Sequence, residues 1–320
     1  MSEIARTPDE RFVDLPGYPF TPHYADVAAE GMPALRMHYL DEGPADGPVA
    51  LLLHGQPTWS YLYRKVVPVL VERGIRVIAP DLIGYGRSDK PVERTDYTFE
   101  RHIAWLRSLV VGLDLQRVTL VAQDWGGPIG FSVLAAETTR FASVVAANTI
   151  LHTADQGLAG RLTWAVHGTG DSRVVLEEGL VDYLLYTQRA PELVASLFVG
   201  AATTTPLPPE VLAAYDAPFP DQRLTAGMRQ MIALLPLTRN DVGARIGRRT
   251  MRALAEFERP FVTAYSDGDP ATRGWAEVFA EHVPGARGQC HVTIVGAGHF
   301  LQEDAGVELA GVIADVVALG

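Results

Sequence analysis

Cysteine and lysine are nearly absent from this sequence of 320 residues. Its single cysteine, Cys290, excludes an intramolecular disulfide and a zinc site built from several cysteines. A lone cysteine fits a reducing compartment, and we expect it to be a small buried residue. Lys65 and Lys90 are the only lysines, and the formal net charge is -11. Because nucleic acids are bound by clustered cations, this balance argues against a nucleic-acid partner.

The sequence also lacks a long apolar run. No segment is apolar enough over a sufficient length to span a bilayer, which argues against a membrane partner. Glu3 and Asp9 stand near the start, where a secretory signal would be basic and then apolar. We therefore expect a cytoplasmic protein, and we expect a monomer. What is present, 48% hydrophobic and 20% charged residues, is the composition of a globular protein that buries a sizeable core.

Short β-rich runs alternate with helical patterns along the chain. This alternation predicts a mostly parallel sheet with helices on both faces. We expect strands at 49–53, 75–79, 118–122, 144–147, 260–265 and 291–295, with an antiparallel edge strand at 35–40. Thr98 is expected to cap a helix that begins at Phe99, and Asp304 to cap the last helix. Function is then expected at the carboxyl ends of the strands, where open α/β sheets bind ligands.

The alternation stops between residues 151 and 236. Strand candidates vanish there, and helical segments such as 174–186 and 191–198 follow one another, with a loop at 203–209. So long a stretch without a strand exceeds an ordinary βαβ connection, which makes simple crossover helices the weaker alternative. We therefore predict core residues 1–150, a helical insertion at 151–236 and core residues 237–320.

Residues suited to catalysis follow several of the predicted strands. The stretch VAQDWGG (121–127) places Asp124 at a turn between a strand and a helix. The stretches HGQPTW (54–59), DGDP (267–270) and GHF (298–300) follow other strands. An aspartate at such a turn, followed later in the chain by an acid and a histidine, matches the order of nucleophile, acid and base in one class of catalytic triad.

Each of these residues also has an ordinary structural interpretation. Asp124 could be a helix N-cap, but the glycine pair at 126–127 allows a sharp turn and a close approach of the backbone to a ligand, which a plain cap does not need. His299 could be a core or surface histidine, but at the end of the last strand it is a candidate general base. Asp269 could be a turn residue before a proline. Asp267 is its rival as the triad acid, and we favour Asp269.

Longer motifs resemble one known family. This chain resembles the haloalkane dehalogenases in four motifs, HGQPTWSYLYRKVVP (54–68), APDLIGYGRSDKP (79–91), VAQDWGG (121–127) and GAGHFLQED (296–304). It resembles the branch of that family with an Asp-His-Asp triad in two more, RTPDERFVDLPGYPF (6–20) and DAPFPD (216–221). The resemblance covers both parts of the core and is weaker across the insertion. It implies an α/β-hydrolase fold, with a mostly parallel eight-stranded sheet flanked by helices and an inserted helical cap. It also implies Asp124 as nucleophile, His299 as base and Asp269 as acid.

A carboxylate nucleophile restricts the substrate. An aspartate with an ordinary pKa near ~3.9 is ionised at neutral pH and needs no base. Its attack on a carbonyl would give a labile anhydride, whereas attack on a saturated carbon gives an ester, so we expect a carbon–halogen bond or an epoxide as the target. His299, oriented by Asp269, would activate water against the ester on Asp124. The backbone N–H groups of Gln56 and Trp125 would hold the oxyanion.

The leaving group separates two hypotheses. A halide needs donors that cannot protonate it, and the indole N–H of Trp125 fits. The resemblance implies a second donor from the cap, assigned to Trp164, which could also be a core aromatic. We therefore expect a haloalkane dehalogenase that converts a small apolar halogenated substrate into an alcohol, a halide and a proton, without cofactor or metal. The alternative is an epoxide hydrolase using Tyr183 and Tyr186, which could equally form a half-buried helix face.

Overall fold

The computed structural model describes residues 3–154 and 180–320, and within them eight strands form one sheet in the order β10-β9-β8-β7-β4-β5-β3-β2. The strands are β2 (His23–Val27), β3 (Leu35–Glu42), β4 (Val49–Leu53), β5 (Arg76–Pro80), β7 (Val118–Asp124), β8 (Phe141–Thr149), β9 (Phe261–Ser266) and β10 (Val292–Ile294). β3 pairs antiparallel with β2 and β5, and the other neighbours are parallel. A further antiparallel pair joins β1 (Ile4–Ala5) to β6 (Lys90–Pro91). The predicted mostly parallel eight-stranded sheet is confirmed.

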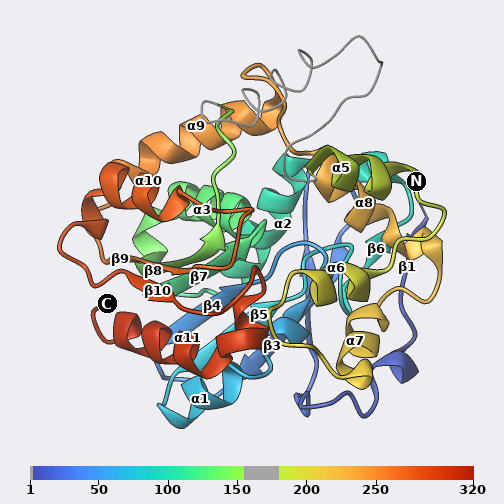
Figure 1. The fold of residues 1–320 in the computed structure, drawn as a ribbon, viewed down its shortest axis with the longest axis horizontal. Helices are drawn as coiled ribbons and strands as arrows, with labels where there is room; N and C mark the ends of the chain where they lie inside the picture. The colour runs from blue at the N-terminus through green and yellow to red at the C-terminus, as the bar shows by residue number, and fades with distance from the viewer. Residues whose placement is uncertain (1–2, 155–179) are drawn as a thin grey trace.

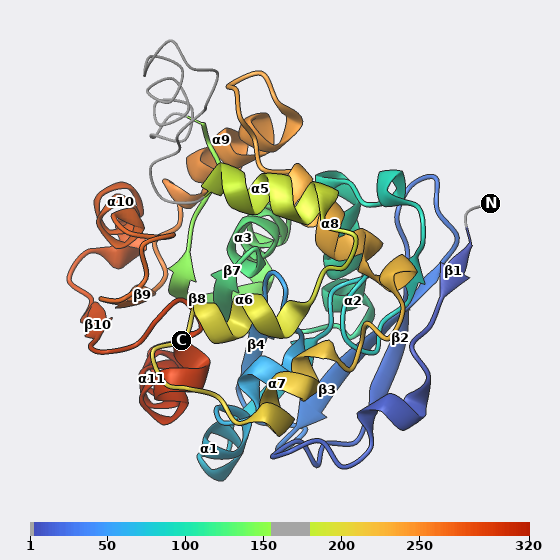
Figure 2. The same cartoon turned by 45° about the vertical axis from the view of Figure 1, so that its right-hand side comes forward.

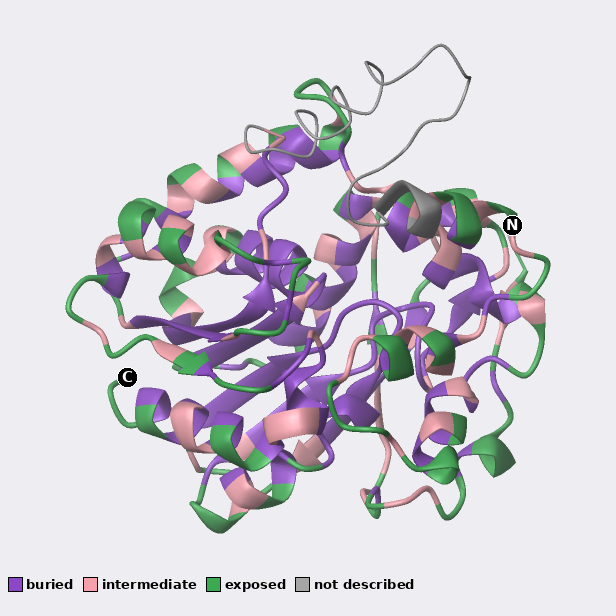
Figure 3. Ribbon diagram, viewed as in Figure 1, coloured by how far each residue is buried: buried purple, intermediate pink, exposed green. Residues whose placement is uncertain are grey.

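Helices cover both faces of this sheet. One face carries α1 (Val67–Glu72) and α11 (Leu301–Val317), and the other carries α2 (Phe99–Gly112), α3 (Gly126–Ala136) and α10 (Trp275–His282) (Figure 1). Strands covered on both sides need apolar residues at every position, and β4 (VALLL) is buried throughout (Figure 3). The Thr98 hydroxyl accepts the Arg101 N–H at 3.2 Å, so the predicted cap of α2 is confirmed.

Three local predictions are wrong. The strand expected at the antiparallel edge, β3, is interior, because β2 pairs along its outer side. The polar residues of β2 (HYADV) mask its strand pattern in the sequence. Asp304 does not cap the last helix, which begins at Leu301; its carboxylate instead accepts N–H groups of the loops at Thr204 and Gly298. Cys290 is exposed rather than buried.

Between β8 and β9 the described residues form helices and no strand. These are α5 (Leu180–Arg189), α6 (Ala195–Ala201), α7 (Pro209–Asp216), α8 (Ala226–Ala233) and α9 (Val242–Leu254). Helices α5 to α8 lie on the loops that follow the strands (Figure 2), and the Trp59 indole N–H donates to the Ala214 carbonyl of α7 at 3.2 Å. Helix α9 packs on α3 of the core. The boundaries at 151 and 236 remain a prediction. No helix of residues 3–154 and 180–320 is long and apolar enough to cross a membrane.

Candidate active site

Asp124 lies where β7 turns into α3, with an unusual backbone conformation. Its φ of 48° is in the left-handed region, which residues other than glycine seldom adopt. Two neighbouring segments hold it there. The Thr149 hydroxyl donates to the Asp124 carbonyl at 2.6 Å, and the Gln56 N–H donates to Asp124 Oδ1 at 2.7 Å. The turn therefore presents the carboxylate at the carboxyl end of the sheet in a fixed orientation.

Glycines around this turn let three segments meet. A Cβ at Gly126 would strike the carbonyl of Leu53, and a Cβ at Gly127 would strike the Thr149 hydroxyl. At Gly55 a Cβ would occupy the place of the Asp124 carboxylate. The glycine pair at 126–127 therefore allows close contact with Leu53 and Thr149, and the glycine before Gln56 allows close contact with Asp124. The predicted approach of the pair to a ligand stays a prediction.

His299 lies between two carboxylates. Its Nδ1 is 2.9 Å from Asp269 Oδ2, and its Nε2 is 3.5 Å from Asp124 Oδ2. Asp269 is buried, and its oxygens also accept the Ala271 N–H at 2.9 Å and the Thr272 hydroxyl at 2.5 Å. Asp267 is exposed and accepts the Gly296 N–H instead. Of the two candidate acids, Asp269 is the one that bonds to His299.

The charges of this row are coupled. Burial lowers the pKa of His299, but the carboxylates of Asp124 and Asp269 outweigh it and raise the pKa to about 10. Burial raises the pKa of Asp269, and hydrogen bonds from His299 and Thr272 outweigh it in turn, so this pKa lies below its ordinary value. At neutral pH the site therefore holds an imidazolium between two carboxylates. Removing the charge of either carboxylate lowers the pKa of His299.

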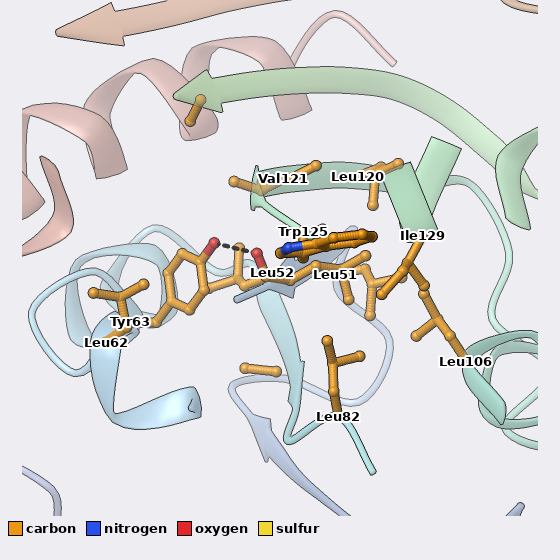
Figure 4. Packing of buried hydrophobic residues seen from close by; sticks show 14 of the residues in the cluster. Leu51, Leu52, Leu62, Tyr63, Leu82, Leu106, Leu120, Val121, Trp125 and Ile129 are labelled. Carbon is orange, nitrogen blue, oxygen red and sulfur yellow. Dashed lines mark hydrogen bonds between the residues drawn. The ribbon is translucent and has the colours of Figure 1, made fainter. Parts of the chain in front are cut away.

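The other side of Asp124 is lined by Trp125 and Gln56. The indole of Trp125 is 2% exposed and lies among apolar side chains that include Leu106 and Ile129 (Figure 4). The Gln56 Oε1 accepts the Tyr85 hydroxyl at 2.5 Å, while Gln56 Nε2 is buried without a partner.

Comparison with known proteins places the chain in a family. A model of the alpha/beta hydrolase fold matches residues 48–170. A haloalkane dehalogenase of Psychrobacter cryohalolentis is 43% identical over 98% of each chain, and one of Mycobacterium marinum is 45% identical over 96% of this chain and 97% of its own. The chain belongs to the haloalkane dehalogenase family. A solved haloalkane dehalogenase structure from Paraglaciecola agarilytica, described as tetrameric, superposes with a TM-score of 0.82 at 34% identity over 97% of each chain.

The family resemblance and the fold predicted from the motifs are thus confirmed. The epoxide hydrolase alternative is not supported by these dehalogenase relatives. Tyr186 is 41% exposed, with its hydroxyl 3.5 Å from the Glu192 carbonyl, so it lies on the surface of α5. The side chain of Tyr183 lies outside the described residues, as does Trp164.

Two residues of this dehalogenase-family site were missed by the sequence analysis. Asn148, at the end of β8 with a φ of 40°, donates from Nδ2 to the carbonyls of Gly298 and His299, each at 3.0 Å. The side-chain nitrogen of Gln123 donates to the His299 carbonyl at 3.4 Å. Both amides hold the loop that carries the histidine. Their signal in the sequence is an uncharged polar residue at the end of an apolar strand, and such a residue has no ionisable group that would mark it as part of a catalytic site.

Proposed function

We propose that this protein is a haloalkane dehalogenase that cleaves the carbon–halogen bond of a small halogenated substrate through an ester on Asp124. The observation that carries the proposal is the row of Asp124, His299 and Asp269 at the carboxyl end of the sheet. The names of the relatives that are 43% and 45% identical over nearly the whole chain support it. We accordingly assign nucleophile, base and acid to these three residues in that order.

In the first step a carboxylate oxygen displaces the halide. Asp124 Oδ1 is held by the Gln56 N–H, which leaves Oδ2 for attack on the saturated carbon. The new C–O bond forms as the carbon–halogen bond breaks, and the bonding pair leaves with the halide. The indole N–H of Trp125 stabilises that anion because it donates a hydrogen bond without giving up its proton. Trp164, assigned from the family resemblance, is the proposed second donor.

In the second step water hydrolyses the ester. His299 Nε2 takes a proton from the water, which attacks the carbonyl carbon of the Asp124 ester. Negative charge then builds on Oδ1, where the Gln56 N–H already points and where the Trp125 N–H is the proposed second donor. The alcohol leaves and the carboxylate returns, so His299 keeps the proton as the imidazolium of the free enzyme. The proton that the reaction yields is the one that His299 gives up when the ester forms. Asp269 orients the imidazole through Nδ1 and stabilises the imidazolium.

The electrostatics order these two steps. The carboxylate of Asp124 is one of the two that raise the pKa of His299 to about 10. Alkylation neutralises Asp124 and removes its contribution, so the pKa of His299 falls once the ester exists. The histidine thus becomes a base in the step that needs one, while the free enzyme keeps it protonated.

Four further predictions from the sequence are part of this proposal. They are a helical cap at 151–236, a cytoplasmic location, a monomeric state and a reaction without cofactor or metal. The monomeric state is checked by light scattering of the purified protein, and the relative described as tetrameric provides the alternative result. Cell fractionation checks the location.

Halide release tests the proposed function. The wild type is offered 1-bromobutane and 1,2-dibromoethane, and free bromide is measured beside diol formation from styrene oxide. We expect bromide without diol, abolished in Asp124→Ala and retained in Asp267→Ala. Asp267 is the matched control because it is an exposed aspartate that does not bond to His299. Diol without bromide, or bromide release by Asp124→Ala at the wild-type rate, would contradict the proposal.

A further inference from the structure

His152 stands at the active site with no assigned role. The residue follows β8, and its ring centroid lies 4.7 Å from that of Trp125. It is 6% exposed. The carboxylate of Asp124 is near enough to favour the charged form of the imidazole. His152 is therefore a neighbour of both the proposed nucleophile and the proposed halide donor.

One polar atom of this imidazole is not satisfied. Its Nδ1 is buried and has no hydrogen-bond partner. Burying a polar group without a partner costs about 1–3 kcal/mol. Native structures leave few such groups, and those that remain often reflect a bound molecule or a catalytic role.

Contacts with helix α9 restrict the backbone at His152, so the backbone cannot move to give the ring a hydrogen-bond partner. A Cβ at Gly247 would collide with the His152 carbonyl, so the backbone of α9 touches that carbonyl directly. One residue later, Arg248 Nη1 donates to the Thr153 carbonyl at 2.8 Å. The chain is held at two successive carbonyls that follow the Cα of His152, and the ring lies beside the indole of Trp125.

The ring is neutral at neutral pH. Burial lowers the pKa of His152 to about 4, and the opposing effect of Asp124 does not compensate. A neutral imidazole has one nitrogen that donates and one that accepts a hydrogen bond. A hydroxyl group both donates and accepts, so it can bond to either nitrogen. A purely hydrocarbon substrate chain would leave the ring unsatisfied.

We infer that His152 is a specificity residue whose imidazole hydrogen-bonds a hydroxyl on the substrate, so that the preferred substrates are halogenated alcohols. The inference rests on the proposed function, because it places the halogen at Trp125 and the reacting carbon at Asp124. It narrows the substrate from any small haloalkane to one with a second, polar end. Sites built to bond a substrate hydroxyl discriminate strongly against analogues that lack it.

The test compares two substrates of nearly equal shape. In 3-bromopropan-1-ol a hydroxyl replaces the terminal methyl of 1-bromobutane, and kcat/KM for bromide release is measured for both, with 2-bromoethanol and 1-bromopropane as a shorter pair. The variants are His152→Phe, which keeps a ring against Trp125 and removes both nitrogens, and His152→Leu, which covers the case that the larger ring disturbs folding. Thermal unfolding compares their stability with that of the wild type.

The readout is the ratio of kcat/KM for the alcohol to that for the alkane. We expect this ratio to fall by about tenfold or more in both variants, the loss of one well-formed hydrogen bond to the substrate. A ratio that changes less than twofold in both variants overturns the inference, even if both substrates react more slowly. If the wild type releases no bromide from any of the four compounds, the proposed function falls, and the inference falls with it.

Discussion

The two sides of Asp124 differ in how their polar atoms are satisfied. On the side of His299, the protein supplies partners to the nitrogens: Asp269 accepts three hydrogen bonds, and Asn148 holds the backbone of the histidine loop. The atom that lacks a partner on this side is an oxygen, Gln123 Oε1. On the side of Trp125, nitrogens lack partners. Gln56 Nε2 and His152 Nδ1 are both buried without one.

This difference corresponds to two functions, proton transfer on the His299 side and ligand binding on the Trp125 side. Proton transfer needs groups that hold their position through a cycle in which charges appear and disappear, so the protein fixes them itself. Binding needs donors and acceptors that the ligand satisfies, and these are unsatisfied in its absence. Breaking the first side should therefore stop a chemical step, whereas changing the second should shift affinity and preference.

Replacing His299 should have the largest effect on the rate. In His299→Ala we expect one bromide per enzyme and then a stall, because Asp124 attacks without a base but its ester is not hydrolysed. Steady-state turnover should fall by at least about 10³-fold, within the range for a lost general base. Rapid-quench bromide assays measure the burst, and intact mass shows the alkyl group on the protein. His282→Ala, at an exposed histidine of α10, is the control. Sustained turnover by His299→Ala would remove it as the base.

Removing the charge of Asp269 should come next. In Asp269→Asn the pKa of His299 falls from about 10, because one of the two carboxylates that raise it is gone. The imidazole then loses its proton at a lower pH than in the wild type, and its orientation through Nδ1 is lost. We expect kcat to fall by about 10²-fold and the histidine titration, followed by NMR, to move down in pH. Asp267→Asn should change neither kcat nor the histidine titration. A larger effect in Asp267→Asn than in Asp269→Asn would make Asp267 the triad acid instead.

The amino-acid sequence predicts most of the residues on the His299 side of Asp124 and few of those on the Trp125 side. The strand-end positions of Asp124 and His299 follow from periodicity and turn chemistry, and the order of the chain supplies their roles. Asp269 and Asp267 are both turn residues, and local sequence pattern does not separate them as candidates for the triad acid. Their difference is burial against His299, which depends on how the loop after β9 folds back on the loop after β10.

The remaining site residues are set by contacts between distant segments. Tyr85 and Gln56 are 29 positions apart in the sequence. No local sequence pattern predicts the hydrogen bond from the Tyr85 hydroxyl to Gln56 Oε1, or that Gln56 Nε2 is left without a partner. His152 follows an apolar strand and carries no motif, so only its packing on Trp125 brings it to notice. Likewise β2 was missed because its side chains are mostly polar and its pairing with β3 decides its state.

Trp125→Phe tests the halide side of the comparison. Phenylalanine keeps an aromatic ring in the apolar surroundings of the indole and removes the N–H. Because hydrogen bonds to charged groups are worth about 1.5–3 kcal/mol, we expect bromide to bind about 10-fold or more weakly. Inhibition of turnover by added bromide measures this affinity without relying on the fluorescence of the tryptophan itself. Trp275→Phe on α10 is the control. Unchanged bromide inhibition in Trp125→Phe would take the indole out of the halide site.

The smallest expected effect belongs to Tyr85, which acts on the site through another residue. Its hydroxyl bonds Gln56 Oε1 at 2.5 Å and so fixes which end of the amide is the unpartnered nitrogen. In Tyr85→Phe the amide is free to turn, and we expect kcat/KM to fall by about two- to tenfold, the worth of one neutral hydrogen bond. The decisive measurement is a double-mutant cycle with Gln56→Leu, which keeps the backbone N–H that bonds Asp124. If Tyr85 works by positioning the amide, its replacement has no further effect once the amide is gone. Equal losses in both backgrounds would instead make Tyr85 a packing residue between the core and α8, whose Gly227 carbonyl lies 3.5 Å from the same hydroxyl.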